Sequence, residues 1–263
     1  MKRFLLDPSK AAGDKYSPVI VSPDAIARRA ASVRVLERVS VVASQLARDN
    51  YTDYVGEFYK QGLDICGDDW GFMDLVTVLY AVAEMGQPQS YLEIGVRRGR
   101  SACAVAAASP ATDMYAFDMW QQGYAGNENP GPALVRSELA KFGYCGNIKF
   151  IDGDSHITVP KFLRANPELL FDCINVDGDH SLNGAWDDLR NVLPRLRVGG
   201  VVVFDDTSNP YCPGLDEVWK DLLRADPGIT GYSYAGLGTG VSFGIRVRES
   251  QFTDVRKRRF WWR

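Results

Sequence analysis

Short runs rich in β-branched and apolar residues alternate with segments of helical periodicity from Ser90 onward. The first five runs are apolar on both faces and are separated by helical segments, which is typical of a parallel sheet covered on both sides. We therefore expect an α/β fold: a doubly wound, Rossmann-like, mostly parallel seven-stranded sheet with helices on both faces. Strands are expected at 90–95, 114–118, 148–152, 172–177, 200–205, 230–234 and 241–247, and helices near 100–108, 132–142, 159–166, 184–194 and 215–224.

The segment before Ser90 is expected to be a helical extension. Apolar residues recur at three- and four-residue steps from Asp24 to Asn50, which predicts one long helix, and a second helical stretch runs from Trp70 to Met85. We divide the chain into a helical extension or lid (1–89), an α/β domain (90–250) and a basic aromatic tail (251–263). The extension could equally form a dimer interface, which would make the protein a homo-oligomer.

The chain has a formal net charge of −3, although residues 256–263 hold five basic residues and no acid. The rest is therefore acidic, which argues against a nucleic-acid partner. The tail either contacts an anionic surface or is a solvated terminus. No apolar run reaches the ~20 residues of a membrane span. The chain has five cysteines, an odd number, and none of them forms a C-x-x-C pair. The opening residues do not resemble a secretory signal. We therefore expect reduced thiols and a cytoplasmic location.

Ligands of doubly wound sheets bind beyond the carboxyl ends of the strands. The first strand carries Glu93 near its end, and Gly95 and Gly99 follow, before a helix that includes Ser101. Two glycines at this spacing let the backbone turn tightly and approach a ligand closely, although an ordinary strand-to-helix turn has the same pattern. Asp118 ends the second strand 23 residues beyond Gly95, close to the spacing of about 20 at which an acidic side chain can accept hydrogen bonds from both ribose hydroxyls.

Acidic side chains also follow the fourth and fifth strands, at Asp177, Asp205 and Asp206. These strands can be neighbours in such a sheet, and three carboxylates in contact repel one another unless a cation lies between them. Oxygen ligands suit Mg²⁺, Mn²⁺ or Ca²⁺, whereas helix capping is the alternative for Asp206 in particular. His180, three residues after Asp177, would act as a general base beside this ion, while a structural role is the ordinary interpretation of a lone histidine.

These residues together resemble class I S-adenosylmethionine-dependent methyltransferases. Within them they are most similar to the metal-dependent O-methyltransferases, which include catechol O-methyltransferase and the sugar-modifying macrocin O-methyltransferase group. Asp206 departs from the catechol pattern, which has asparagine there, and matches the sugar-type pattern. The resemblance covers about residues 90–247 and rests on the order and spacing of Glu93-x-Gly95-x-x-x-Gly99-x-Ser101, Asp118, Gly153-Asp154-Ser155, Asp177-Gly178-Asp179-His180 and Gly199–Asp206.

The resemblance implies S-adenosyl-L-methionine as the cofactor and Mg²⁺, or another hard divalent cation, as the metal. It implies that His180 is the catalytic base, assisted by Asp177, and that Asp118 binds the ribose. Residues 90–250 would then be the S-adenosylmethionine-binding catalytic domain. The methionine part of the cofactor would contact Glu93, Gly95 and Gly99, and Ser101 would also contact the cofactor. The adenine would contact Met119, Trp120, Asp154 and Ser155. The metal would be bound by Asp177, Asp205 and Asp206.

We therefore expect an S-adenosylmethionine-dependent, Mg²⁺-dependent O-methyltransferase that transfers a methyl group to a hydroxyl of a sugar or another small-molecule diol. Two alternatives stay open: a non-catalytic binding module that keeps the cofactor fold, and a nicotinamide-dependent oxidoreductase, against which Arg97 at the place of the middle glycine counts. The helices of 24–85 and the segment 121–131 are expected to cover the acceptor pocket. Trp70, Tyr124 and Tyr211 either stack against the acceptor or pack as ordinary aromatic residues.

Overall fold

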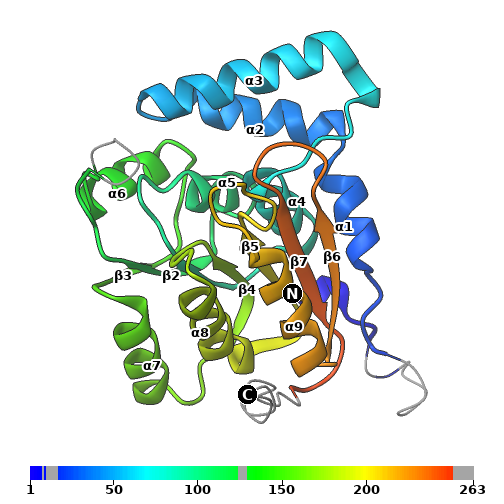
Figure 1. Ribbon diagram of the computed structural model, residues 1–263, viewed down its shortest axis with the longest axis vertical. Coiled ribbons are helices and arrows are strands. Elements are labelled where there is room, and N and C mark those ends of the chain that lie inside the picture. The colour runs from blue at the N-terminus through cyan, green and yellow to red at the C-terminus, as the bar shows by residue number, and fades with distance from the viewer. Residues whose placement is uncertain (8, 10–16, 124–128, 251–263) are drawn as a thin grey trace.

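The computed structural model of the protein describes residues 1–7, 9, 17–123 and 129–250, and a seven-stranded sheet lies at its centre (Figure 1). The strand order is β3-β2-β1-β4-β5-β7-β6, with β7 antiparallel to both of its neighbours and all other pairs parallel. The predicted fold class is thus confirmed. The strands are β1 (Ser90–Ile94), β2 (Asp113–Asp118), β3 (Ile148–Asp152), β4 (Phe171–Val176), β5 (Leu196–Asp205), β6 (Ile229–Tyr234) and β7 (Val241–Arg246).

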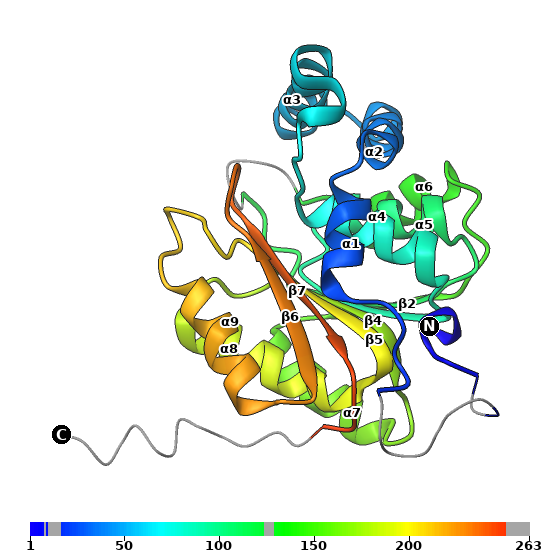
Figure 2. The same ribbon diagram turned by 90° about the vertical axis from the view of Figure 1, so that its right-hand side faces the viewer.

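Helices cover both faces of the sheet (Figure 2). Alternate residues of a strand point to opposite faces, so Tyr91 and Cys173 join one hydrophobic cluster while Leu92 and Ile174 join the other. The first cluster includes residues of α4, α5 and α6, and the second includes residues of α7, α8 and α9. The bounds of these helices are α4 (Leu75–Gly86), α5 (Arg100–Ala108), α6 (Pro132–Ala140), α7 (Ser155–Ala165), α8 (Leu182–Val192) and α9 (Leu215–Ala225).

The helices before the sheet differ from the prediction. The expected long helix over 24–50 is wrong, because the chain forms α1 (Pro23–Ala30) and α2 (Val33–Gln45), with an extended Ser32 between them. A further helix, α3 (Asn50–Cys66), was not predicted, and it is followed by a 3₁₀ turn at Gly67–Asp69. The helix expected from Trp70 begins at Leu75 instead. In Figures 1 and 2, α2 and α3 lie side by side beyond the end of the sheet.

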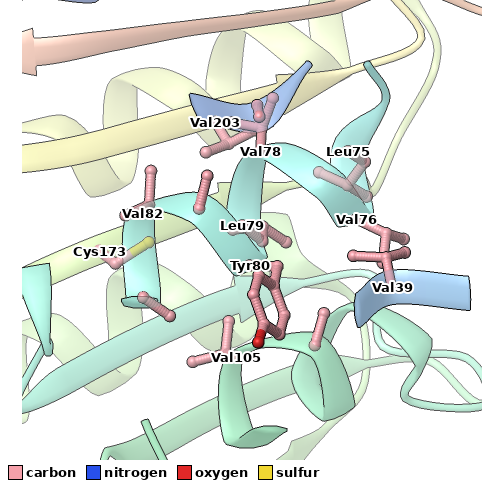
Figure 3. Close-up of a cluster of buried hydrophobic side chains, with 14 of the residues drawn as sticks. Val39, Leu75, Val76, Val78, Leu79, Tyr80, Val82, Val105, Cys173 and Val203 are labelled. Carbon is pink, nitrogen blue, oxygen red and sulfur yellow. The ribbon is translucent and has the colours of Figure 1, made fainter. Parts of the chain in front are cut away.

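The helix α4 lies at the centre of the first cluster. Its side chains contact α2 through Val39, α5 through Val105, and the sheet through Cys173 of β4 and Val203 of β5 (Figure 3). A helix that is apolar on all sides is stable only when it is buried. This packing explains why α4, although it precedes the α/β domain in the sequence, shares one core with the sheet.

No helix among the described residues is long and apolar enough to cross a membrane. Three predictions concern residues wholly or partly outside the described part: the basic aromatic tail over 251–263, the proposed contact of Tyr124 with the acceptor, and the cover over 121–131, of which 124–128 are not described. The predicted division at residues 89 and 250 stays a prediction.

Candidate active site

The turn after β1 packs against the end of β4. Gly95 has a φ of +85°, and a Cβ atom at this position would overlap the carbonyl oxygen of Asp177 and lie 2.6 Å from its carbonyl carbon. Asp177 N also donates a hydrogen bond to Ile94 O, at 2.9 Å. Only glycine tolerates both the left-handed backbone and this approach. The predicted close approach at Gly95 is therefore made, in this structure, by the backbone of the neighbouring strand end.

Asp118 fixes the same turn from the other side. Its Oδ2 accepts hydrogen bonds from Val96 N at 2.7 Å and Arg97 N at 2.6 Å, and its Oδ1 accepts one from Trp120 N at 2.5 Å. Two carboxylate oxygens offer about four acceptor positions, so one remains after these three amides. The carboxylate expected to bind a ribose thus holds the glycine-rich turn and keeps limited acceptor capacity.

Glu93 lies under this turn and is almost completely buried. Its carboxylate accepts hydrogen bonds from Ser101 Oγ and from Asn175 Nδ2, the latter at 3.1 Å. Burial raises the pKa of Glu93 to about 8. Ser101 is buried as well and is in the first turn of α5, whose N-cap is Gly99 at a φ of +78°. The structure therefore brings these four predicted cofactor residues, Gly95 included, into one continuous region.

The residues predicted beside the adenine lie at the ends of β2 and β3. Met119 is 62% exposed, and Trp120 Nε1 donates a hydrogen bond to Asp152 Oδ1 at 2.7 Å. Asp154 is the N-cap of α7 and accepts a hydrogen bond from His156 N at 2.8 Å. These side chains form one edge of the region, with Met119 open to solvent.

His156 and Ser155 face a buried acid on α8. The Nε2 atom of His156 lies 3.6 Å from Asp188 Oδ1, and Ser155 donates a hydrogen bond to the same carboxylate. Burial raises the pKa of Asp188 to about 6. Ser155, predicted to contact the adenine, is therefore already engaged in joining α7 to α8.

Two of the three predicted acids, Asp177 and Asp206, lie beside His180. Its Nε2 atom lies 3.3 Å from Asp177 Oδ1 and 3.4 Å from Asp206 Oδ2. The hydrogen bond with Asp177 raises the pKa of His180. Burial, and then repulsion from the neighbouring carboxylates, raises the pKa of Asp205 well above its usual value, and burial also raises that of Asp177. The sequence thus located a group of mutually repelling acids around one imidazole.

Cys212 was missed. Within the described residues, His180, Asp206 and Cys212 form a group whose possible ligand atoms all lie within 4.8 Å of one another. This set shares only Asp206 with the predicted trio of Asp177, Asp205 and Asp206. Burial raises the pKa of the Cys212 thiol, and the nearby carboxylates raise it further. A cysteine in the turn-rich segment that follows Asp206 is the signal that could have drawn attention to it.

Unusual backbone conformations gather at the same strand ends. Four non-glycine residues of the described part have a positive φ, and three of them are Arg97, Trp120 and Asp206, at 50°, 52° and 59°. Each follows a different strand of the sheet. Left-handed backbone at residues other than glycine is costly and is concentrated at functional sites. This clustering supports the carboxyl edge of the sheet as the functional site.

The unpredicted helix α3 also reaches this region. The guanidinium of Arg100 lies 4.7 Å from the centre of the Tyr51 ring, and that of Arg97 lies 5.4 Å from it. Tyr59 of the same helix donates a hydrogen bond to Asp74, the residue that caps α4. Cation–π contacts of this kind tie the helix to the glycine-rich turn. The α3 helix is therefore part of the wall of the site.

The remaining aromatic candidates are in different environments. Trp70 stacks on Phe72 with ring centres 5.0 Å apart, within an aromatic group that includes Phe58 and Tyr234. Tyr211 is 92% exposed. Trp70 therefore has a packing role in this structure, whereas Tyr211 is available for a ligand.

Comparison with known proteins assigns one stretch of the chain to a known kind of domain. The family model described as a methyltransferase domain matches residues 92–207, which run from β1 to the turn after β5. The matched stretch contains the glycine-rich turn, Asp118, His180 and the acidic strand ends. The resemblance to methyltransferases predicted from these motifs is therefore confirmed over this stretch of the chain.

Solved structures share the fold. The chain is 19% identical to the methyltransferase PaMTH1 of Podospora anserina, solved with SAH, with a TM-score of 0.52 over 82% of this chain and 88% of that one. The O-methyltransferase TomG of Streptomyces achromogenes, in complex with SAM, is 19% identical, with a TM-score of 0.51 over 81% and 90%. CalS11, a TDP-rhamnose 3′-O-methyltransferase, is 18% identical, with a TM-score of 0.50 over 86% and 96%.

A curated sequence relative is the uncharacterized protein y4gI of Sinorhizobium fredii. It is 28% identical over 160 residues, which are 58% of this chain. The aligned region spans 17% of the length of that relative. The similarity therefore concerns one portion of a much longer protein.

Proposed function

We propose that the protein is an S-adenosylmethionine-dependent O-methyltransferase that methylates a hydroxyl of a sugar or another small-molecule diol, with a divalent cation such as Mg²⁺ at the acidic strand ends. The observation that carries this proposal is the contact between two turns. The glycine-rich turn at Gly95 packs directly on Asp177, whose carboxylate lies 3.3 Å from His180 Nε2. A cofactor-type turn and a candidate base are thus neighbours in one methyltransferase domain.

The chain's own groups suit the cofactor. Gly95 and Gly99 allow the left-handed backbone of the turn, and Asp118 retains acceptor capacity at the position where class I enzymes bind the ribose. When bound, S-adenosylmethionine supplies a methyl group on a positively charged sulfur, which needs alignment more than activation. The buried carboxylate of Glu93 lies beneath this turn, and the resemblance assigns it to the methionine part of the cofactor.

The donor set suits a divalent cation. Asp177, Asp205 and Asp206 are acids whose mutual repulsion and burial a positive ion would relieve. When bound there, Mg²⁺ would lower the pKa of an acceptor hydroxyl. Two oxygen atoms of a vicinal diol could share such an ion, which is why a sugar or related diol is the proposed acceptor. CalS11, which shares the fold, is described as acting on a sugar.

His180 performs the proton transfer in this proposal. The hydrogen bond with Asp177 and the charge of Asp206 raise its pKa and make the imidazole a stronger base than a free histidine. Its Nε2 would accept the proton of the acceptor hydroxyl, and bound S-adenosylmethionine would supply the methyl group. Arg100, held by Tyr51, keeps a positive charge near Asp177.

Thermal unfolding tests the cofactor first. A ligand at 100 times its dissociation constant adds about 2.7 kcal/mol to the free energy of unfolding. We expect a raised Tm with S-adenosylhomocysteine and none with NAD, and an additional increase with Mg²⁺ that a chelator removes. A shift with NAD alone would favour the oxidoreductase, and a shift with neither would favour the binding module.

Vicinal diols then test the acceptor. We expect methyl transfer to a diol and a much lower rate with the same diol after one hydroxyl is blocked as an ether. Equal rates would refute the shared-ion arrangement. We also propose a cytoplasmic location, which the five free cysteines support, and self-association through α2 and α3.

A further inference from the structure

The side chains of His180, Asp206 and Cys212 converge on one point beyond the ends of β4 and β5. All three are half-buried, and their possible ligand atoms lie within 4.8 Å of one another. Asp177 Oδ1 lies 3.3 Å from His180 Nε2 but does not belong to this group. The group thus combines an imidazole nitrogen, a thiol sulfur and one carboxylate.

Two consecutive turns bring Cys212 to this point. Asn209 N donates a hydrogen bond to Asp206 O at 3.1 Å, and Cys212 N donates one to Asn209 O at 3.0 Å. Ser208 N donates to Thr239 O at 2.7 Å, which fixes the first turn against the loop before β7. The backbone therefore folds back on Asp206 through its own hydrogen bonds and places the thiol beside the carboxylate.

The spacing of the imidazole and carboxylate donors suits a shared tetrahedral ion. Nitrogen and oxygen ligands about 2.0–2.1 Å from Zn²⁺, at tetrahedral angles, lie ~3.4 Å from each other. The observed separation between His180 Nε2 and Asp206 Oδ2 is 3.4 Å. Sulfur lies further from such an ion, at about 2.3 Å, so a thiol ligand needs a wider spacing, and Cys212 lies within 4.8 Å of the other two donors.

Donor chemistry then selects the ion. Mg²⁺ prefers six oxygen ligands and keeps several waters, whereas thiolate and imidazole ligands suit Zn²⁺ and related transition ions. We infer that His180, Asp206 and Cys212 bind a borderline divalent ion such as Zn²⁺, with the fourth position left for water. This site and the carboxylate site proposed for Mg²⁺ share Asp206, so the two ions exclude one another.

Occupancy of this site has a consequence for methyl transfer, which rests on the function proposed above. The ion would use the lone pair of His180 Nε2 that must otherwise accept the hydroxyl proton. Zn²⁺ would therefore inhibit the enzyme in the presence of Mg²⁺. The inhibition would be reversed by a chelator, and it would weaken when the thiol is removed.

Cobalt spectroscopy tests the site without any substrate. Reduced, metal-free protein is titrated with Co²⁺ in the presence and absence of Mg²⁺, and a thiolate ligand produces a charge-transfer band in the near ultraviolet. We expect this band in the unmodified chain, its loss in Cys212→Ser, and its retention in Cys145→Ser, which removes an exposed cysteine at the opposite edge of the sheet. Competition with Zn²⁺ should give a dissociation constant that rises at least roughly 10–100-fold in Cys212→Ser.

Each outcome decides the inference. Absence of the band from the unmodified chain would refute it, whether or not the variants fold, and so would a band that survives Cys212→Ser. Binding of S-adenosylhomocysteine is measured on the same samples. A normal cofactor affinity without the cobalt band would overturn the zinc site and leave the proposed methyltransferase intact, whereas the reverse result would sustain the metal site and count against the methyltransferase.

Discussion

Gly95→Ala tests whether the contact between the two turns holds the site together. The added Cβ would overlap the backbone of Asp177, at a φ of +85°. Left-handed backbone costs about 1–2 kcal/mol for a residue other than glycine, and overpacking against a backbone that cannot rotate away costs about 1–3 kcal/mol more. We therefore expect a loss of about 2–5 kcal/mol in the free energy of unfolding, and weaker binding of S-adenosylhomocysteine.

Two other glycines separate the contributions. Gly143 has a φ of +65°, and an added Cβ there would meet no atom within 4 Å, so Gly143→Ala should show the backbone cost of about 1–2 kcal/mol alone. Gly56 lies inside α3 with equally open space, so Gly56→Ala should stabilise the protein by about 0.5–1 kcal/mol. Urea unfolding measures all three. A loss in Gly95→Ala no greater than that in Gly143→Ala would refute the role of the contact.

Three further predictions concern charged side chains. His180→Ala should lower methyl transfer by roughly 10²–10⁴-fold with an unchanged dissociation constant for S-adenosylhomocysteine, and unaltered turnover would remove His180 from the mechanism. Because the folded state raises the pKa of Glu93 from 4.5 to about 8, it favours the protonated form. Stability relative to Glu93→Gln should therefore fall, by up to about 5 kcal/mol, as the pH rises through that window, and a flat difference in urea unfolding would contradict this. Asp226→Ala leaves the buried Arg246 without its carboxylate partner, at 3.0 Å, and should cost about 3–5 kcal/mol. Asp216→Ala breaks a surface pair and should cost about 0–1 kcal/mol, so equal losses on thermal unfolding would refute the difference.

The sheet was predictable because its strands are buried on both faces. Runs such as 172–177 and 200–205 have few polar residues, and the helices between them keep the strands apart in sequence. All seven strands and the five helices between 100 and 225 were expected within a few residues. The order that places β7 between β5 and β6 was not predicted, since single strand patterns carry no information on their neighbours.

The N-terminal helices were harder to predict for two physical reasons. The apolar pattern continues across Ser32, so periodicity does not reveal the break between α1 and α2. In α3 the buried residues are Val55 and Tyr59, which are too few for a clear stripe. The start of α3 nevertheless carries a sequence signal, because aspartate is a favoured N-cap residue. In the structure Asp49 is this N-cap and accepts a hydrogen bond from Thr52 N at 2.6 Å.

The strand-end rule predicts some residues of the candidate site and misses others. Glu93, Asp118 and the acids around His180 follow from the rule that ligands bind beyond the carboxyl ends of strands. Cys212 and Tyr51 come from a loop and from a helix outside the matched domain, and only their tertiary contacts bring them to the site. Local patterns cannot supply such contacts.

The contact between Gly95 and Asp177 distinguishes two kinds of segment at this edge of the sheet: turns that pack on each other and loops that do not take part in that packing. The backbone segments 94–96 and 177–178 support each other, so a change in either one displaces both halves of the site. The loops at 207–214 and 237–240 do not take part in this backbone contact. Redesign of acceptor preference would therefore start from those two loops, with the paired turns kept as a fixed frame.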